Sequence, residues 1–285
     1  SDGTVSLIEG AAEGFGTSTI ISNSATMTGA TFDSNSNRVV IVYREGSNGY
    51  GTAIVGTVSD RTISFGTAVT YESASSNYNA ITFDSNSNKV VIAYQDAGNS
   101  GYTTAIVGTV DPSANSISFG SQVDYGSGTA TSEVASTFDT NSNKVVLCYT
   151  RGGFCKSRVG TVSGTGISFG TEVYVVPFPA SGSNNGITFD SNSNKVVAVT
   201  LSTGNLRSAV GTVSGTGISY GTATLVAGNY AEMNRVVFDS STNKIIAFWK
   251  DGGNSYRGTS AVGTVSGTSI SFASPTILAS GSTGD

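Results

Sequence analysis

The residues best suited to chemistry lie in three similar stretches, each holding two aromatic residues around a carboxylate and an amide. They are Tyr43, Glu45, Asn48 and Tyr50; Tyr94, Asp96, Asn99 and Tyr102; and Trp249, Asp251, Asn254 and Tyr256. A flat apolar ring beside hydrogen-bonding groups is an arrangement that suits a sugar. We therefore interpret these twelve residues as candidate ligand-binding residues. The alternative is that the polar residues cap a hairpin and the aromatic residues fill gaps between sheets.

A second motif, Asp-Ser-Asn-Ser-Asn, begins at Asp33, Asp84 and Asp190 and has relatives at Asp139 and Asp239. It matches the first half of a calcium-binding loop, but it lacks the glycine and the closing glutamate that complete such a loop. Aspartate also caps hairpin turns, and asparagine tolerates the left-handed backbone conformation that such turns need. Because a hairpin is needed in every copy and a catalytic carboxylate only once, we interpret the motif as structural.

Other catalytic classes find little support in the composition. The chain has no histidine, which excludes a Cys-His pair and His-containing metal clusters. The seven glutamates are dispersed, and none has a partner at a recognisable spacing of the kind that glycosidases need. The Ser-x-Asp-x-Gly-x-Thr-Trp box of sialidases is absent. We therefore predict a protein that is not an enzyme, with no catalytic residues, no metal and no cofactor.

Two cysteines, Cys148 and Cys155, flank a six-residue stretch that resembles a hairpin turn. They form either a disulfide, which would imply an oxidising location, or two free buried thiols. The 14 basic residues are scattered and the net charge is −5. The sequence therefore shows no cluster of basic residues that would bind nucleic acid or an anionic membrane. No apolar run approaches the length of a membrane-spanning helix. We expect neither nucleic-acid binding nor membrane insertion.

The candidate residues are carried on a repeat of about 50 residues, which indicates a β-propeller. A Phe-Asp pair marks the five copies at Phe32, Phe83, Phe138, Phe189 and Phe238. β-Branched residues are dense and turn signals recur regularly, so each copy is predicted to form four antiparallel strands. In the second copy the first three strands cover residues 80–83, 89–94 and 102–110. We expect Phe83 to lie in the core of its blade, so Phe83→Ala should cost about 3–5 kcal/mol.

The predicted domain is a five-bladed, all-β propeller over residues 24–285. Its repeats span approximately 24–72, 73–126, 127–177, 178–227 and 228–280. Residues 1–23 echo a third and a fourth strand and form a partial repeat, so six blades, one of them incomplete, are the alternative. The chain begins and ends within repeats, and we expect it to be a piece of a longer protein.

The segments between repeats are long and dissimilar, so we expect them to share one variable face with the candidate binding loops. Small residues crowd the expected central channel at Gly29, Ala80, Ala135 and Gly186, whereas Arg235 would place a charge there. Pro177-Phe178-Pro179 forms an apolar wedge in one of these segments, either a rigid crossover or a contact with a partner.

The amino-acid sequence of the repeat, with the segments FDSNSNKVVIAYQDAGNS and GTVSGTGISFGT, resembles that of repeat-built virion and tail-fibre proteins of marine bacteriophages. The architecture is similar to that of the five-bladed tachylectin-2-type lectins. The resemblance covers almost the whole chain and implies an adhesive or structural role on a virion or at an extracellular or cell surface. The implied partners are a host-surface glycan and neighbouring subunits of the assembly. The alternatives are a purely structural spacer and, third, a polysaccharide-acting enzyme.

Overall fold

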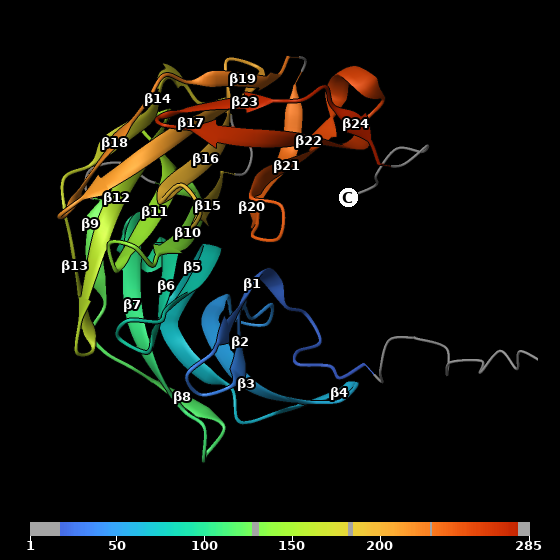
Figure 1. Cartoon of the computed structure of the whole chain (residues 1–285). Coiled ribbons are helices and arrows are strands. Elements are labelled where there is room, and N and C mark those ends of the chain that lie inside the picture. Colours follow the sequence, from blue (N-terminus) through green and yellow to red (C-terminus); the bar gives the residue numbers. More distant parts are fainter. Residues whose placement is uncertain (1–17, 127–130, 182–184, 229, 279–285) are drawn as a thin grey trace, which may run out of the picture.

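The computed structural model describes residues 18–126, 131–181, 185–228 and 230–278. Five antiparallel sheets, or blades, are arranged around a common axis (Figure 1), which confirms the all-β propeller predicted from the repeat. Within the described residues the only helical elements are two 3₁₀ turns, and no helix is long and apolar enough to cross a membrane.

Each blade contains four strands that follow one another from the axis outward. Blade 1 holds β1 (Thr26–Asp33), β2 (Arg38–Arg44), β3 (Tyr50–Ser59) and β4 (Thr62–Phe65). Blade 2 holds the second half of β5 (Val69–Asp84), β6 (Lys89–Asp96), β7 (Tyr102–Asp111) and β8 (Ser116–Phe119). Blade 3 holds β10 (Thr131–Asp139), β11 (Lys144–Arg151), β12 (Phe154–Ser163) and β13 (Gly166–Phe169). Blade 4 holds β15 (Gly186–Asp190), β16 (Lys195–Ser202), β17 (Asn205–Ser214) and β18 (Gly217–Tyr220). Blade 5 holds β20 (Ala231–Asp239), β21 (Lys244–Asp251), β22 (Arg257–Ser266) and β23 (Ser269–Phe272).

The outer edge of every blade is built in two pieces, a feature that the repeat pattern did not reveal. The fourth strand pairs with only one half of the third strand, as β4 does with β3. The chain that follows turns back and pairs with the other half. These returning pieces are the first half of β5 and the strands β9 (Val123–Gly126), β14 (Val173–Pro179), β19 (Thr224–Ala227) and β24 (Thr276–Ile277).

The hairpin between the first and second strands is held by the aspartate of the repeated motif. In blade 2, Asp84 Oδ1 accepts hydrogen bonds from the backbone N–H groups of Asn86 and Ser87 at 2.9 and 3.0 Å. Asn88 then adopts a left-handed conformation with φ 54°. The aspartates of the other four blades cap their turns in the same way. The interpretation of the motif as structural is therefore confirmed.

Apolar cores fill the four spaces between consecutive blades. Each blade has a forward face, which packs on the next blade along the chain, and a rear face, which packs on the preceding one. Between blades 1 and 2, Val42 and Val55 of the forward face meet Val90 and Ile92 of the rear face. Three further clusters join blades 2 and 3, blades 3 and 4, and blades 4 and 5 in the same manner. The alternating pattern of the second and third strands thus buries both faces of the inner blades.

A glycine after each fourth strand sets the distance between neighbouring blades. A Cβ atom on Gly170 would lie 1.8 Å from the backbone oxygen of Thr216, at the hairpin tip of the next blade. Gly66, Gly120 and Gly221 meet the next hairpin in the same way, at 1.8–2.0 Å. This backbone contact excludes any side chain, so glycine is required at four of the five blades.

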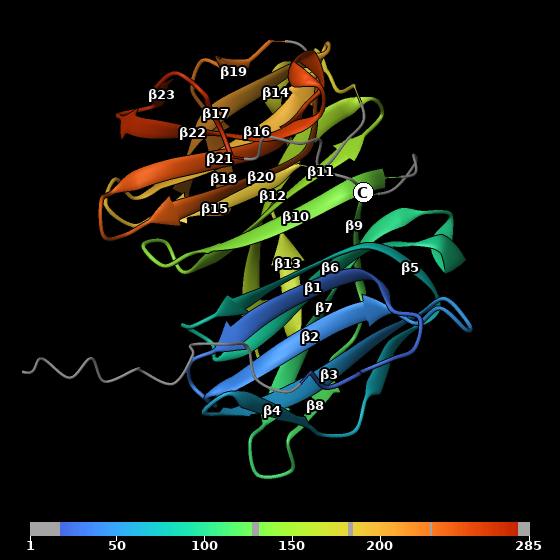
Figure 2. The ribbon, with the colours of Figure 1, turned by 90° about the vertical axis from the view of Figure 1, so that its right-hand side faces the viewer.

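The described ring is open on one side, between β20 and β1 (Figures 1 and 2). Val262, on the forward face of blade 5, is 45% exposed, whereas its equivalents in the other four blades are fully buried. Phe32, on the rear face of blade 1, is 53% exposed, whereas Phe138 is 8% exposed. The two terminal blades therefore present the apolar faces that every inner blade buries.

Candidate functional site

A β-bulge interrupts the first strand of four blades where the strand reaches the central channel. The register shifts just before Gly29, Ala80, Ala135 and Arg235. The bulged residues are Met27, Tyr78, Glu133 and Met233, whose φ angles lie between 50° and 55°. Such angles are uncommon for side chains of this size, and bulges of this kind re-aim a side chain. Glycine and asparagine favour such φ angles, and neither occurs at these four positions. The bulges were therefore not predicted from the sequence.

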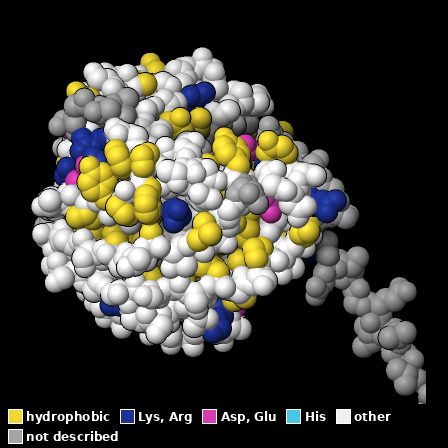
Figure 3. Space-filling view, turned by 90° about the horizontal axis from the view of Figure 1, so that it is seen from above, with side chains coloured by type: hydrophobic (Ala, Val, Ile, Leu, Met, Phe, Trp, Pro, Cys, Tyr) yellow, Lys and Arg dark blue, Asp and Glu magenta, His cyan; other side chains and the backbone are white. Residues whose placement is uncertain are grey.

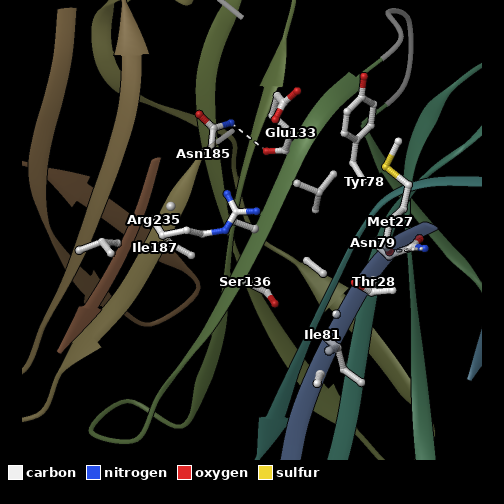
Figure 4. A pocket seen from close by; sticks show the side chains of 17 residues that line it. Met27, Thr28, Tyr78, Asn79, Ile81, Glu133, Ser136, Asn185, Ile187 and Arg235 are labelled. Atoms are coloured by element: carbon white, nitrogen blue, oxygen red, sulfur yellow. Dashed lines mark hydrogen bonds between the residues drawn. The ribbon is translucent and has the colours of Figure 1, made fainter. Parts of the chain in front are cut away.

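Three of the bulged residues, Met27, Tyr78 and Glu133, border a cavity of about 310 Å³ at the propeller axis (Figure 4). Four small residues predicted to line the channel, Gly29, Ala80, Ala135 and Gly186, do line it. Arg235 takes the equivalent place in blade 5, and its side chain extends into the cavity toward the strand that carries Glu133 and Ser136. The small residues create the space, and Arg235 supplies the charge expected from the sequence.

Polar groups of different kinds converge on this cavity. Burial raises the pKa of Glu133, and the positive charge of Arg235 opposes that rise. Asn185 Nδ2 donates to the backbone oxygen of Glu133 at 2.9 Å and to Thr150 Oγ1 at 3.1 Å. The Oδ1 atom of Asn185 is buried and has no hydrogen-bond partner. A guanidinium and a carboxyl group at this cavity can therefore meet a ligand rich in hydroxyl groups.

A second pocket, of about 470 Å³, lies at the outer part of blade 2 and is lined by polar residues. Glu72 Oε2 accepts hydrogen bonds from Tyr94 Oη at 3.0 Å and from Gln122 Nε2 at 2.9 Å. Asn99 Nδ2 donates to Asp124 Oδ2 at 2.6 Å. The lining residues are Glu72, Asp96, Gly98, Asn99, Gln122 and Asp124.

Two carboxyl groups of this pocket influence each other. Burial and the adjacent charge of Glu72 raise the pKa of Asp96, and backbone N–H groups of Gly98 and Asn99 oppose that rise. Within the described residues, no group of three or more Asp, Glu, Cys or His side chains could hold a metal ion. The pocket therefore offers hydrogen-bond acceptors, one of which holds a proton more readily than usual.

The corresponding region of blade 3 is occupied by an ion cluster. Glu172 accepts hydrogen bonds from Arg151 Nη2 at 2.6 Å, Lys156 Nζ at 2.8 Å and Tyr149 Oη at 2.7 Å. Burial alone would raise the pKa of Glu172, but these three donors outweigh it and hold the pKa at about 2. Because these three donors are already engaged by Glu172, we interpret the cluster as a structural element.

Three of the aromatic residues predicted to contact a ligand are buried in the structure. Tyr43, Tyr94 and Trp249 are at most 3% exposed, and Tyr94 and Trp249 pack in cores between blades, so the three rings present no stacking surface to a ligand. The reason is that β2, β6 and β21 extend beyond the aromatic residue, and the strand alternation turns its ring inward. The alternative interpretation, in which aromatic residues fill gaps between sheets, describes Tyr94 and Trp249.

The other predicted residues lie in the loops and largely shape them. Asp96 caps the 3₁₀ turn η1 (Ala97–Asn99) and Asp251 caps η2 (Gly252–Asn254). Asn48 Oδ1 accepts from the backbone N–H of Tyr50 at 2.9 Å. Glu45 accepts a hydrogen bond from Ser22, Tyr102 is half-buried, and Asn254 belongs to η2.

Tyr256 is the predicted aromatic residue with the most exposed ring, at 45%, and Lys250 Nζ lies 5.1 Å from its centroid. Of the twelve predicted residues, only Asp96 and Asn99 line one of the two pockets. The residues that sequence reasoning did not select are Tyr78, Glu133 and Asn185 at the channel and Glu72 and Asp124 in blade 2.

Two further predictions concern Cys148, Cys155 and the proline wedge. The sulfur atoms of the buried cysteines lie 3.0 Å apart across β11 and β12, and both are free thiols in the structure. The wedge Pro177–Pro179 ends β14, and the guanidinium of Arg207 lies 4.5 Å from the ring centre of Phe178. Figure 3 shows apolar side chains grouped on the surface above β14 and β19, with single basic side chains among them.

Comparisons with known proteins give the fold but no family. No family model matches the chain, and no curated protein matches it. Among solved structures, the NanB sialidase of Streptococcus pneumoniae has a TM-score of 0.58 and 10% identity, over 81% of this chain and 54% of NanB. The lectin AofleA of Arthrobotrys oligospora has a TM-score of 0.56 and 11% identity, over 90% of this chain and 72% of AofleA. A GH43 glycoside hydrolase has a TM-score of 0.51 and 10% identity, over 87% of this chain and 52% of that chain.

The chain thus spans about half the length of NanB and of the GH43 enzyme. At such low identity the likeness concerns architecture alone. Five four-stranded blades around an axial cavity, together with these neighbours, identify the chain as a β-propeller.

Proposed function

We propose that this chain is a non-enzymatic recognition module that binds carbohydrate at the mouth of its central channel. The observation that carries the proposal is the set of bulged residues around the cavity. Met27, Tyr78 and Glu133 line the cavity from equivalent positions on equivalent strands, yet their chemistry differs. A repeated scaffold that presents different side chains at one place is typical of a binding surface on a rigid support.

The chemistry of the cavity suits a sugar residue. Its volume of about 310 Å³ lies at the lower end of the range for small-molecule sites. Arg235 donates hydrogen bonds, Glu133 accepts them, and Tyr78 and Met27 provide apolar contact. An acidic sugar would gain further from the guanidinium of Arg235.

The biological setting that we propose is a virion or an extracellular surface. The sequence of the repeat resembles that of bacteriophage virion and tail-fibre proteins. The structural neighbours include a lectin and glycoside-acting enzymes. In a fibre that carries many copies, weak single sites gain avidity. The Pro177–Pro179 wedge is the surface that we assign to a neighbouring subunit.

The experiment that tests the proposal is a glycan array probed with the full chain, followed by affinity measurements on variants. Arg235→Gln should weaken binding by about tenfold or more, because a hydrogen bond to a charged group is lost. Lys89→Gln, on the opposite face of the propeller, is the matched control and should leave affinity unchanged. Absence of binding to any glycan would support the spacer alternative instead.

An enzyme acting on polysaccharide is a second candidate, and Asp96 with its raised pKa beside Glu72 is the observation that favours it. Glycosidases keep their two carboxyl groups roughly 5 Å or more apart. Asp96 and Glu72 lie within hydrogen-bonding reach of each other, so this pair favours binding over hydrolysis. Release of reducing ends from polysaccharide, abolished by Glu72→Gln, would establish the enzyme and refute the recognition module.

A further inference from the structure

The forward face of blade 5 is an interface without a visible partner. Val262 is 45% exposed, whereas Val55, Val107, Val159 and Val210 at the same position are fully buried. Ile246 and Phe248 are partly exposed, although their equivalents in the other four blades are fully buried. In each inner blade these positions pack on the rear face of the next blade.

The rear face of blade 1 shows the complementary exposure. Val58 is 54% exposed, whereas the valines at its position in the other four blades are packed in inter-blade cores. Figure 2 looks into the opening between these two faces, with β10 on its far side. One further blade of the same kind would continue both interfaces, since each exposed face has the composition that its partner faces bind elsewhere.

The chain that precedes blade 1 already follows the path of a segment between two blades. Ser22 Oγ donates to Glu45 Oε1 at 3.0 Å, and Thr19 Oγ1 donates to the backbone oxygen of Ile63 at 3.3 Å. Ser22 follows Phe15 at the distance at which Glu72 follows Phe65, and Glu72 lies beside Asp96, the equivalent of Glu45. Residues 18–25 therefore reach blade 1 as the corresponding segment of blade 1 reaches blade 2.

The sequence of residues 3–17 fits the outer half of such a preceding blade. Gly3-Thr4-Val5-Ser6 repeats the end of a third strand, and Phe15-Gly16-Thr17 repeats the end of a fourth strand. The stretch of sequence between these two segments is longer than the one between the equivalent segments of any of the five blades. Blade 5 alone carries alanine, Ala273, where the other blades carry the glycine that touches the next hairpin tip.

We propose that residues 3–17 supply the outer strands of a sixth blade, with Val5 and Phe15 packed on Val262 of blade 5. The equivalent contacts are visible between inner blades. Tyr220, the counterpart of Phe15 in blade 4, donates from Oη to Ser157 Oγ of blade 3 at 3.1 Å. Val213, the counterpart of Val5, packs in the same cluster. The N-terminal segment would thereby join the last blade to the first.

A thiol placed on the exposed face tests this in the full chain. Val262→Cys should react with a water-soluble thiol reagent at least about tenfold more slowly than Leu225→Cys, an exposed reference position on β19. When Phe15→Asp is combined with Val262→Cys, the thiol should react as fast as that of Leu225→Cys. When Phe15→Asp is combined with Leu225→Cys, the reaction rate should not change. Cys148 and Cys155, both fully buried, should stay unreactive and so report that the blades remain folded.

Two outcomes would overturn the proposal. One is a Val262→Cys thiol that reacts as fast as the reference whether or not Phe15 is changed. The other is protection that depends on protein concentration and not on Phe15, which would assign the face to a second copy of the chain. Neither outcome bears on sugar binding at the channel, so this test and the glycan array fail independently.

Discussion

Truncation of the repeated phenylalanine should cost very different amounts in different blades. Phe138 and Phe32 occupy the same position and pair with equivalent valines, Val145 and Val39. Phe138 is 8% exposed, so Phe138→Ala removes a buried ring and leaves a cavity, at about 3–5 kcal/mol. Phe32 is 53% exposed and borders the opening. Phe32→Ala therefore loses only about half of the free energy gained by transferring the ring out of water, and it leaves no closed cavity. We expect about 1–2 kcal/mol there.

The assay is urea unfolding of the full chain, with the free energy of unfolding taken from the midpoint at constant slope. Phe83 is partly buried between blades 1 and 2, and Phe83→Ala should fall near the lower end of the predicted 3–5 kcal/mol. Equal losses at Phe32 and Phe138 would refute the inference that the rear face of blade 1 differs from those of the inner blades.

Three other predictions concern packing, charge and thiols. Gly170→Ala should destabilise by about 1–3 kcal/mol in thermal unfolding, because its Cβ overlaps the next hairpin, whereas Ala273→Gly should cost less than 1 kcal/mol. The carboxyl pKa of Glu172 is depressed to about 2, so its stabilisation is complete above pH 4.5 and is lost as the pH falls toward 2. Glu172→Gln should abolish that pH-dependent loss of about 2–3 kcal/mol, measured by unfolding between pH 5 and 2. The contact with Cys155 and burial raise the pKa of the Cys148 thiol, so neither cysteine should react with a thiol reagent until the protein is denatured.

Local chemistry explains which parts of the fold could be predicted. Asp84 and Asn88 determine their turn within five residues, so the hairpins were evident from the sequence. The small residue Ala80 at the axis was likewise predictable, because the same crowding recurs in each blade. The bulge at Tyr78 was not, since tyrosine has no preference for the left-handed conformation that it adopts there.

The candidate sites were harder to predict because their residues come from distant segments. The pocket at blade 2 brings together Glu72, from the outer edge of blade 1, with Asp96 and Asp124 of blade 2, which are distant in the sequence. Tyr94 illustrates the opposite error, in which a buried residue is predicted to bind a ligand. The residues after Tyr94 have the composition of a loop, but the strand continues to Asp96. Spacing along the chain identifies such residues only when the full length of the strands is known.

The glycine contact between blades has a consequence for how such a chain can change over generations. Since the meeting point of Gly170 and Thr216 involves a glycine on one side and a backbone oxygen on the other, it makes little demand on side chains. A unit of about 50 residues can therefore be duplicated, lost or exchanged by recombination while its neighbours still recognise it. The same contact is directional, from the end of one unit to the hairpin of the next, so an added unit can join in only one orientation.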